Sequence, residues 1–298
     1  MPSHVVIGIH GLSPKPEPGP HSKDWISAIC EGLSRNFAVN VDATRFGFEL
    51  VYWADWLGHA AIKTGEDREP YERLAGTGPL PWYRQRLTDE ATRRALDAFA
   101  DPMDWVKGTP SLDWIRRHTG LDDIGTAILQ RKLVDLGTYY RETDKRELLR
   151  KRVADKLIEH KGKRIMLVAH SMGSIVAYDV LRDLGRSEPD LIVEHFVTLG
   201  SPLGMPYVLK HIRAENASVR TPSMVRRWTN LADRRDPVAI DVHLRDEFDP
   251  NDRGVAVEDG LVLNGYLSPP NPPGKSNYHK IYGYLRAPEF SDVVKSFV

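Results

Sequence analysis

Short apolar runs alternate with helix-periodic segments along most of this chain of 298 residues. The apolar runs are rich in β-branched residues and bounded by turn formers, which is typical of strands buried on both faces. We expect such strands at 4–9, 48–53, 164–170, 191–200 and 224–231. Apolar residues at helical spacing predict helices at 23–33, 144–160, 172–184 and 287–297. This alternation predicts the α/β class, with a mostly parallel twisted sheet and helices on both of its faces.

Two segments depart from the alternation. We interpret residues 255–263 as a hairpin and residues 55–122 as a mostly helical insertion within a single domain that spans 1–298. The insertion is rich in aromatic residues: Trp56, Trp82, Tyr83, Trp105 and Trp114. These residues would either line an apolar substrate channel or form a satellite core. Its basic residues would either meet an acidic partner or simply be solvated.

Charge and composition exclude several function classes. Lys plus Arg number 41 and Asp plus Glu also number 41, so nothing in the net charge favours nucleic acid or an anionic membrane as the main partner. The opening residues lack the basic region and apolar stretch of an export signal. No apolar run approaches the roughly 20 residues of a membrane span. We therefore expect a cytoplasmic protein without an integral membrane segment. The single cysteine, Cys30, is interpreted as an apolar filler rather than a reactive thiol.

Ser171 stands directly between the strand predicted at 164–170 and the helix that begins at Met172. A strand that turns at once into a helix pushes the residue at the apex of the turn into the cleft. The neighbours two positions away must be small, and Ala169 and Gly173 are. The spacing is that of G-x-S-x-G, with Ala in place of the first Gly. We expect Ser171 to be an exposed nucleophile; the alternative is a serine that caps a helix.

A serine hydroxyl is a poor nucleophile until a base removes its proton and an acid orients that base. His279 lies in a Gly- and Pro-rich loop before the last predicted helix, and we expect it to be the base. The other histidines after Ser171 lie within a strand, on a helical stretch or close behind an acidic loop: His195, His211 and His243.

The acid is expected in the loop that follows the strand at 224–231, where Asp233 and Asp236 are both candidates. We favour Asp236, because the proline after it would rigidify the turn and Val238 would anchor the turn to the core. Asp233 remains open, with a cap or a pair with a neighbouring arginine as its other role.

Ester hydrolysis also needs N–H donors for the developing oxyanion. The backbone N–H of Met172 at the helix start is one candidate. Leu12 offers the second in the loop after the first strand, where Gly11 lets the backbone approach and His10 would shape the loop.

These stretches together resemble the α/β-hydrolase superfamily, and within it the lipase/esterase-like members. The resemblance covers 4–54 and about 123–298, and five segments carry it: IHG (9–11), AHSMGS (169–174), VTLGSPLG (197–204), WTNLADRRDPV (228–238) and NYHKIY (277–282). The resemblance implies these roles: Ser171 nucleophile, His279 base, Asp236 orienting acid, Leu12 and Met172 oxyanion donors, with His10, Gly11, His170 and Gly173 as supporting motif residues. In this superfamily extra segments often form a cap over the active site, although caps more commonly enter later than 55–122.

We therefore expect a serine hydrolase that cleaves a carboxylic ester through an acyl-enzyme on Ser171, without a metal or cofactor. Its partner would be a small acyl ester, a lipid among the candidates. The same three residues would serve a thioesterase, an amidase or an acyltransferase. A protein of another class, which keeps the fold but only binds a partner through 55–122, is the remaining alternative.

Overall fold

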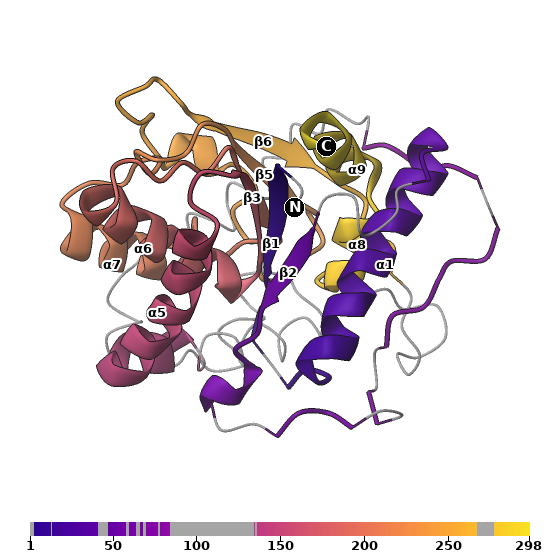
Figure 1. The fold of residues 1–298 in the computed structure, drawn as a ribbon, viewed down its shortest axis with the longest axis horizontal. Coiled ribbons are helices and arrows are strands. Elements are labelled where there is room, and N and C mark those ends of the chain that lie inside the picture. The colour runs from indigo at the N-terminus through magenta and orange to yellow at the C-terminus, as the bar shows by residue number, and fades with distance from the viewer. Residues whose placement is uncertain are drawn as a thin grey trace.

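The computed structural model describes residues 3–12, 14–40, 47–57, 60–63, 66–67, 70–76, 78–83, 134, 136–266 and 277–298. Within them, six parallel strands form one sheet in the order β2-β1-β3-β4-β5-β6 (Figure 1). The strands are β1 (His4–Ile9), β2 (Phe48–Val51), β3 (Arg164–His170), β4 (His195–Leu199), β5 (Trp228–Ala232) and β6 (Val257–Leu261).

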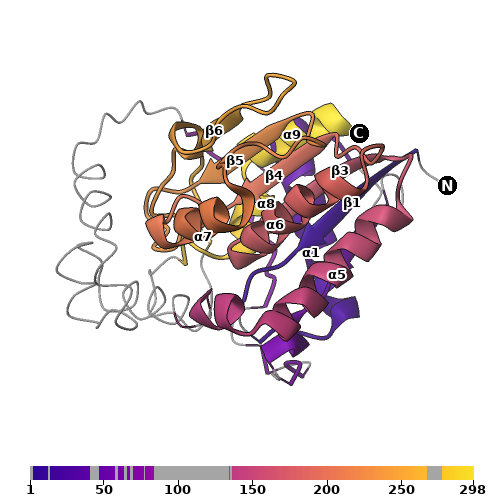
Figure 2. The same cartoon turned by 90° about the vertical axis from the view of Figure 1, so that its left-hand side faces the viewer.

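Helices cover both faces of this sheet. One layer holds α1 (Pro18–Phe37), α8 (Ile281–Leu285) and α9 (Pro288–Phe297). The other holds α5 (Thr143–Glu159), α6 (Met172–Ser187) and α7 (Pro206–Asn216), which lie side by side in Figure 2. Two short 3₁₀ helices are η1 (Ala54–Leu57) and η2 (Leu244–Asp246). The predicted α/β class is confirmed.

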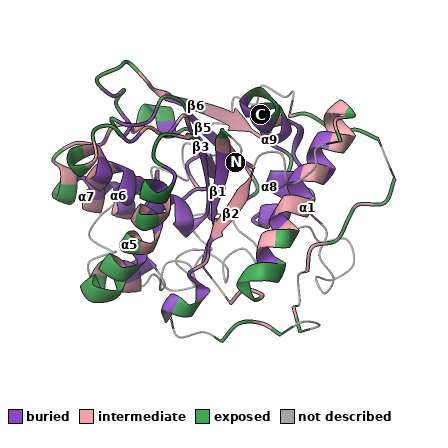
Figure 3. Cartoon of the chain, viewed as in Figure 1, coloured by how far each residue is buried: buried purple, intermediate pink, exposed green. Residues whose placement is uncertain are grey.

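The two layers explain why the strands are almost continuously apolar. Along β3, Ile165 and Leu167 pack into the core beneath α5, α6 and α7, whereas Met166 and Val168 pack into the core beneath α1, α8 and α9. All four side chains are fully buried. Figure 3 shows most of the neighbouring strand β1 in the colour of buried residues as well. A strand with helices on both faces has no solvent-facing side, so its sequence does not alternate between apolar and polar residues.

The predicted hairpin at 255–263 is wrong. The segment forms one strand, β6, which pairs in parallel with β5 along its whole length. The side chain of Asp259 accepts a hydrogen bond from Asn230 Nδ2 at 2.9 Å. The polar groups of this segment therefore bond to the neighbouring strand β5, and the segment does not fold back on itself as a hairpin.

Most of the predicted insertion, 84–122, lies outside the described residues. The described residues of 70–83, here called the strap, run along α1 and α9. The backbone N–H groups of three strap residues donate to side chains on these helices: Leu74 to Glu31, Leu80 to Asn36 and Tyr83 to Glu289. The strap therefore packs on the layer that holds α1, α8 and α9.

The aromatic residues of the insertion have different environments. Trp56 is buried between Trp53 and Tyr139 in the main core beneath α5, α6 and α7, and not in a satellite core. Trp82 is partly exposed and contacts Phe37 edge-on. Trp105 and Trp114 lie outside the described residues. None of the helices in the described part is long and apolar enough to cross a membrane.

Candidate active site

The strand order gives the sheet a topological switch point between the carboxyl ends of β1 and β3. From β1 the chain passes through α1 to β2 on one side, whereas β3 leads through α6 to β4 on the other. Ligands in open α/β sheets bind at such a switch point. The register pairs Ile9 with Ala169, so two residues further along Gly11 comes opposite Ser171.

Ser171 occupies a strained turn between β3 and α6. Its φ of 55° and ψ of −135° lie outside the regions that side-chain-bearing residues normally adopt. Its N–H donates to the carbonyl of Leu199 at 3.0 Å, which ties the turn to β4. The strained turn at the strand end is the backbone geometry that the G-x-S-x-G spacing predicts. The serine itself is buried and not exposed as expected, because the ends of β1 and β3 and the residues around the turn pack over it.

The small residues around Ser171 make room for the neighbouring strand. A Cβ on Gly173 would lie 2.6 Å from the carbonyl oxygen of His10 and 2.8 Å from that of Ile9. A Cβ on Gly11 would lie 2.6 Å from Cβ of Ser171. The crowding at Gly173 therefore comes from the end of β1, a strand that is far from Gly173 in the sequence.

Three side chains from distant segments meet at this turn. Nε2 of His279 lies 2.9 Å from Oγ of Ser171. On the other side of the ring, Nδ1 lies 2.9 and 2.8 Å from the two carboxylate oxygens of Asp236. All three residues are buried. In this arrangement Nδ1–H donates to the carboxylate, which leaves Nε2 to accept the serine proton.

The two candidate acids have different hydrogen-bond partners in the structure. Asp236 accepts hydrogen bonds from the N–H of Val238 at 2.9 Å and from the hydroxyl of Tyr284 at 2.6 Å, beside its contact with His279. Asp233 instead pairs with the Arg235 guanidinium at 2.6 Å and accepts the Asn264 N–H. The carboxylate of Asp233 thus holds loops together, while that of Asp236 faces the imidazole.

Residues 141–214 match the family model of lecithin:cholesterol acyltransferase. The matched stretch includes Ser171 but ends before Asp236 and His279. Together with the parallel sheet, the match supports the α/β-hydrolase superfamily. No curated protein matches the chain.

The loop after β1 is held by His10. His10 Nδ1–H donates to the Gly11 carbonyl at 2.8 Å. Its Nε2 accepts a hydrogen bond from the backbone N–H of Trp53 at 3.0 Å. The two rings stack with centroids 5.3 Å apart. Because a planar trans peptide points its C=O and N–H in opposite directions, holding the Gly11 carbonyl also sets the direction of the Leu12 N–H. Trp53 was not singled out from the sequence.

His170 supports the loop that carries His279. Its Nε2–H donates to the His279 carbonyl at 2.9 Å, and the two rings lie 4.7 Å apart. Among the other histidines, His195 contacts Thr229, and burial lowers its pKa to about 3, so it stays neutral. His211 stacks on Tyr140 and His243 is exposed. None of these three bonds to Ser171.

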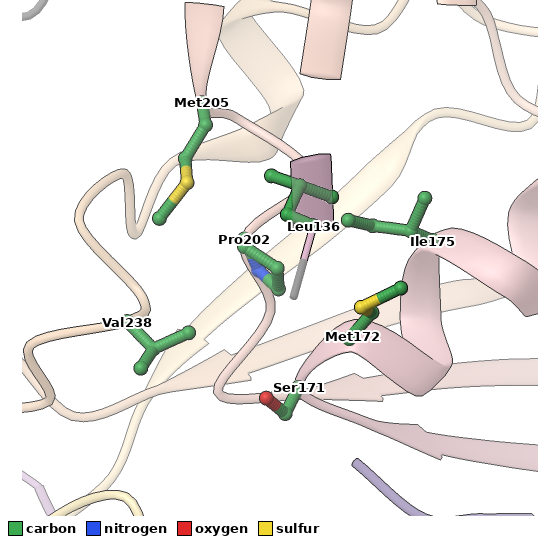
Figure 4. Close-up of a pocket in the computed structure, with 7 residues that line it drawn as sticks. All are labelled: Leu136, Ser171, Met172, Ile175, Pro202, Met205 and Val238. Atoms are coloured by element: carbon green, nitrogen blue, oxygen red, sulfur yellow. The ribbon is translucent and has the colours of Figure 1, made fainter. Parts of the chain in front are cut away.

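A narrow apolar pocket opens beside Ser171. Six apolar residues line it together with the serine: Leu136, Met172, Ile175, Pro202, Met205 and Val238 (Figure 4). Leu136 precedes α5, far from the motif segments in the sequence. No local pattern marks it as part of the site, and only the fold brings it to Ser171.

One cluster in the described residues has the composition of a metal site. Ligand atoms of Glu49, Glu159 and His160 lie within 4.8 Å of one another. However, Nζ of Lys156 lies 2.7 Å from Glu49 and 2.8 Å from Glu159. The ammonium group forms ion pairs with both carboxylates, so the cluster is an ion-pair network between β2 and the end of α5.

Proposed function

We propose that this protein is a serine hydrolase that cleaves a carboxylic ester through an acyl-enzyme on Ser171. The observation that carries the proposal is the chain of hydrogen bonds from Ser171 Oγ to His279 and from His279 to Asp236. This chain starts at a strained turn at the topological switch point of the sheet. The match to an acyltransferase family model supports chemistry at an acyl carbon.

In the first half of the reaction, Nε2 of His279 takes the proton of Ser171 while Oγ bonds to the acyl carbon. The N–H groups of Leu12 and Met172 would donate to the oxyanion that forms. The carboxylate of Asp236 stabilises the imidazolium. When the tetrahedral intermediate collapses, the bond to the alcohol breaks and Nε2–H protonates the leaving oxygen.

In the second half, His279 takes a proton from water as the water oxygen attacks the acyl-enzyme. The bond to Ser171 Oγ then breaks, Oγ recovers its proton from Nε2, and the carboxylic acid leaves. The proton inventory returns to its starting state, so these side chains suffice for hydrolysis.

A fluorophosphonate probe and a p-nitrophenyl ester test the proposal. We expect one covalent adduct on Ser171 by mass spectrometry, none in Ser171→Ala, and loss of p-nitrophenyl acetate turnover in His279→Ala. Ser187→Ala and His243→Ala, which change exposed residues away from the site, are matched controls. An unlabelled wild-type protein, or full turnover by His279→Ala, would contradict the proposal and favour a binding role.

Acyl transfer is the second candidate, and the name of the matched family model favours it. In that reaction an alcohol replaces water in the second half, with the same proton movements. Turnover in the presence of a sterol or a long-chain alcohol, with the products separated by chromatography, distinguishes the two. A new ester would indicate transfer, whereas free acid alone indicates hydrolysis. Thioester and amide substrates in the same assay test the remaining alternatives.

A further inference from the structure

The pocket beside Ser171 has a chemically uniform wall. All seven lining residues are buried, and the serine hydroxyl is the only polar side chain among them. Figure 4 shows the six apolar side chains arranged around the space next to Oγ of Ser171. The six apolar side chains offer no hydrogen bond to a polar group, so this wall suits the hydrocarbon part of a substrate.

The position of His279 decides which part of an ester this pocket receives. His279 directly precedes α8, on the sheet face that carries α1, α8 and α9. The pocket is built from the opposite side, by Met172 and Ile175 of α6 and by Met205 at the start of α7. The leaving alcohol must lie at Nε2 of His279, because this atom protonates it. The acyl chain therefore points away from His279, toward the pocket.

The pocket is small. The volume of the pocket that is open to the centre of a water molecule is about 10 Å³. This is about the room that one water molecule needs. Leu136 and Met205 lie across the space from Ser171 (Figure 4). Because their side chains are buried against the core, a longer chain would have to displace them.

We propose that this pocket binds the acyl group and limits it to short chains, because the space beside Ser171 is about that of one water molecule. The proposal rests on the ester hydrolase function proposed above and adds the substrate class. Leu136 and Met205 are then the residues that set the chain length. Truncating either to alanine removes three side-chain heavy atoms and enlarges the pocket.

The experiment compares kcat/KM for p-nitrophenyl acetate, butyrate, octanoate and laurate. For the wild-type protein we expect the two short esters to be preferred over octanoate by at least about tenfold. Leu136→Ala and Met205→Ala should each raise the ratio of octanoate to acetate by about tenfold. Leu148→Ala, which truncates an exposed leucine of α5, should leave this ratio unchanged.

Two results would overturn the proposal. One is a wild-type preference for octanoate or laurate; the other is an unchanged ratio in folded Leu136→Ala and Met205→Ala. If the alanine variants do not fold, Leu136→Val and Met205→Val each remove one side-chain heavy atom at the same positions and should shift the ratio in the same direction. Failure of the proposed function itself looks different, because the wild-type protein would then hydrolyse none of the esters and Ser171 would take no fluorophosphonate label.

Discussion

Two buried carboxylates in this fold differ in the hydrogen-bond donors that surround them. Asp236, at the candidate site, accepts hydrogen bonds from the Val238 N–H, the Tyr284 hydroxyl and His279. Glu31, on α1 beneath the strap, is buried to the same extent. It accepts hydrogen bonds from two arginines, a tyrosine and a backbone N–H: Arg35, Arg286, Tyr71 and Leu74.

The difference lies in the charge of the donors. Burial by itself raises the pKa of Glu31, but the Leu74 N–H, the Tyr71 hydroxyl and the Arg286 charge more than offset it, so the pKa is lowered. Among the residues that the structure describes, Asp236 has no Lys or Arg partner. A carboxylate neutralised by guanidinium groups joins segments, whereas one held by neutral donors keeps its charge for an imidazolium. Four substitutions test this distinction.

The largest effect is expected for Asp236→Asn. The amide would orient His279 in the wrong tautomer and would not stabilise its charged form. In serine proteases the equivalent change costs about 10⁴ in kcat, so we expect a loss of about 10³ to 10⁴ in kcat/KM for p-nitrophenyl acetate. Asp233→Asn is the matched control and should retain far more activity, because Asp233 faces Arg235. The opposite ranking of the two variants would reverse the assignment of the acid.

Glu31→Gln should affect stability and leave the chemistry unchanged. It leaves the buried Arg286 without a counter-charge, and breaking a buried pair from one side costs about 3–5 kcal/mol of the free energy of unfolding. The loss should shrink at acidic pH. The lowered pKa of Glu31 means that its stabilisation is present above the pKa of the unfolded chain and is lost as pH falls through the folded-state value.

Urea unfolding measures the stability, and fluorophosphonate labelling counts active sites in the folded fraction. Glu49→Gln removes a carboxylate from a partly exposed pair and should cost less than about 1 kcal/mol. Equal losses in both variants would show that the burial of Glu31 and its arginines does not matter.

Asp241→Asn examines a third buried carboxylate, which accepts the His243 N–H. Burial raises the pKa of Asp241 from 3.8 to about 6, and the charges of Glu247 and Asp259 add to the increase. The folded state therefore holds a proton that the unfolded chain has already released. As pH rises from about 4 to about 6 the wild-type protein should lose up to about 3 kcal/mol of stability through this group.

The asparagine variant has no such titration. It should therefore be more stable than the wild-type protein in urea at pH 7.5, and this advantage should diminish at pH 4.5. An unchanged difference between the two proteins across this range would mean that Asp241 does not carry the pH dependence.

Tyr284→Phe should have the smallest effect. Its hydroxyl donates to Asp236 and accepts the Asp233 N–H, so it shares the charge of Asp236 with His279. Without this hydrogen bond, more of the negative charge acts on the imidazole. We expect kcat/KM to fall about 3- to 10-fold, equivalent to about 1 kcal/mol, and the acid limb of its pH profile to move to higher pH.

Tyr178→Phe is the matched control, because the Tyr178 hydroxyl is bonded to the Arg220 carbonyl away from the site. It should leave the acid limb in place. If Tyr284→Phe also leaves the limb in place, the tyrosine has a packing role only.

Local pattern predicted a large part of this molecule. The apolar run at 164–170, the helix after it and the small residues around Ser171 predict the turn, because strand, turn and helix are encoded over a few adjacent residues. The order of serine, acid and histidine along the chain likewise pointed to the three side chains that meet. By contrast, the prediction of a hairpin at 255–263 was wrong. The residues of a polar edge strand do not indicate whether the neighbouring strand runs parallel or antiparallel to it.

The sequence by itself determined the alternation of strands and helices and the candidates for chemistry, because these depend on residues close together in the chain. Only the tertiary structure decided that Asp236 and not Asp233 contacts His279, that Trp53 holds His10, and that Leu136 lines the pocket. Each of these contacts joins residues from separate segments. Packing of the whole sheet and its two helix layers selects them, and no short stretch of sequence contains that information.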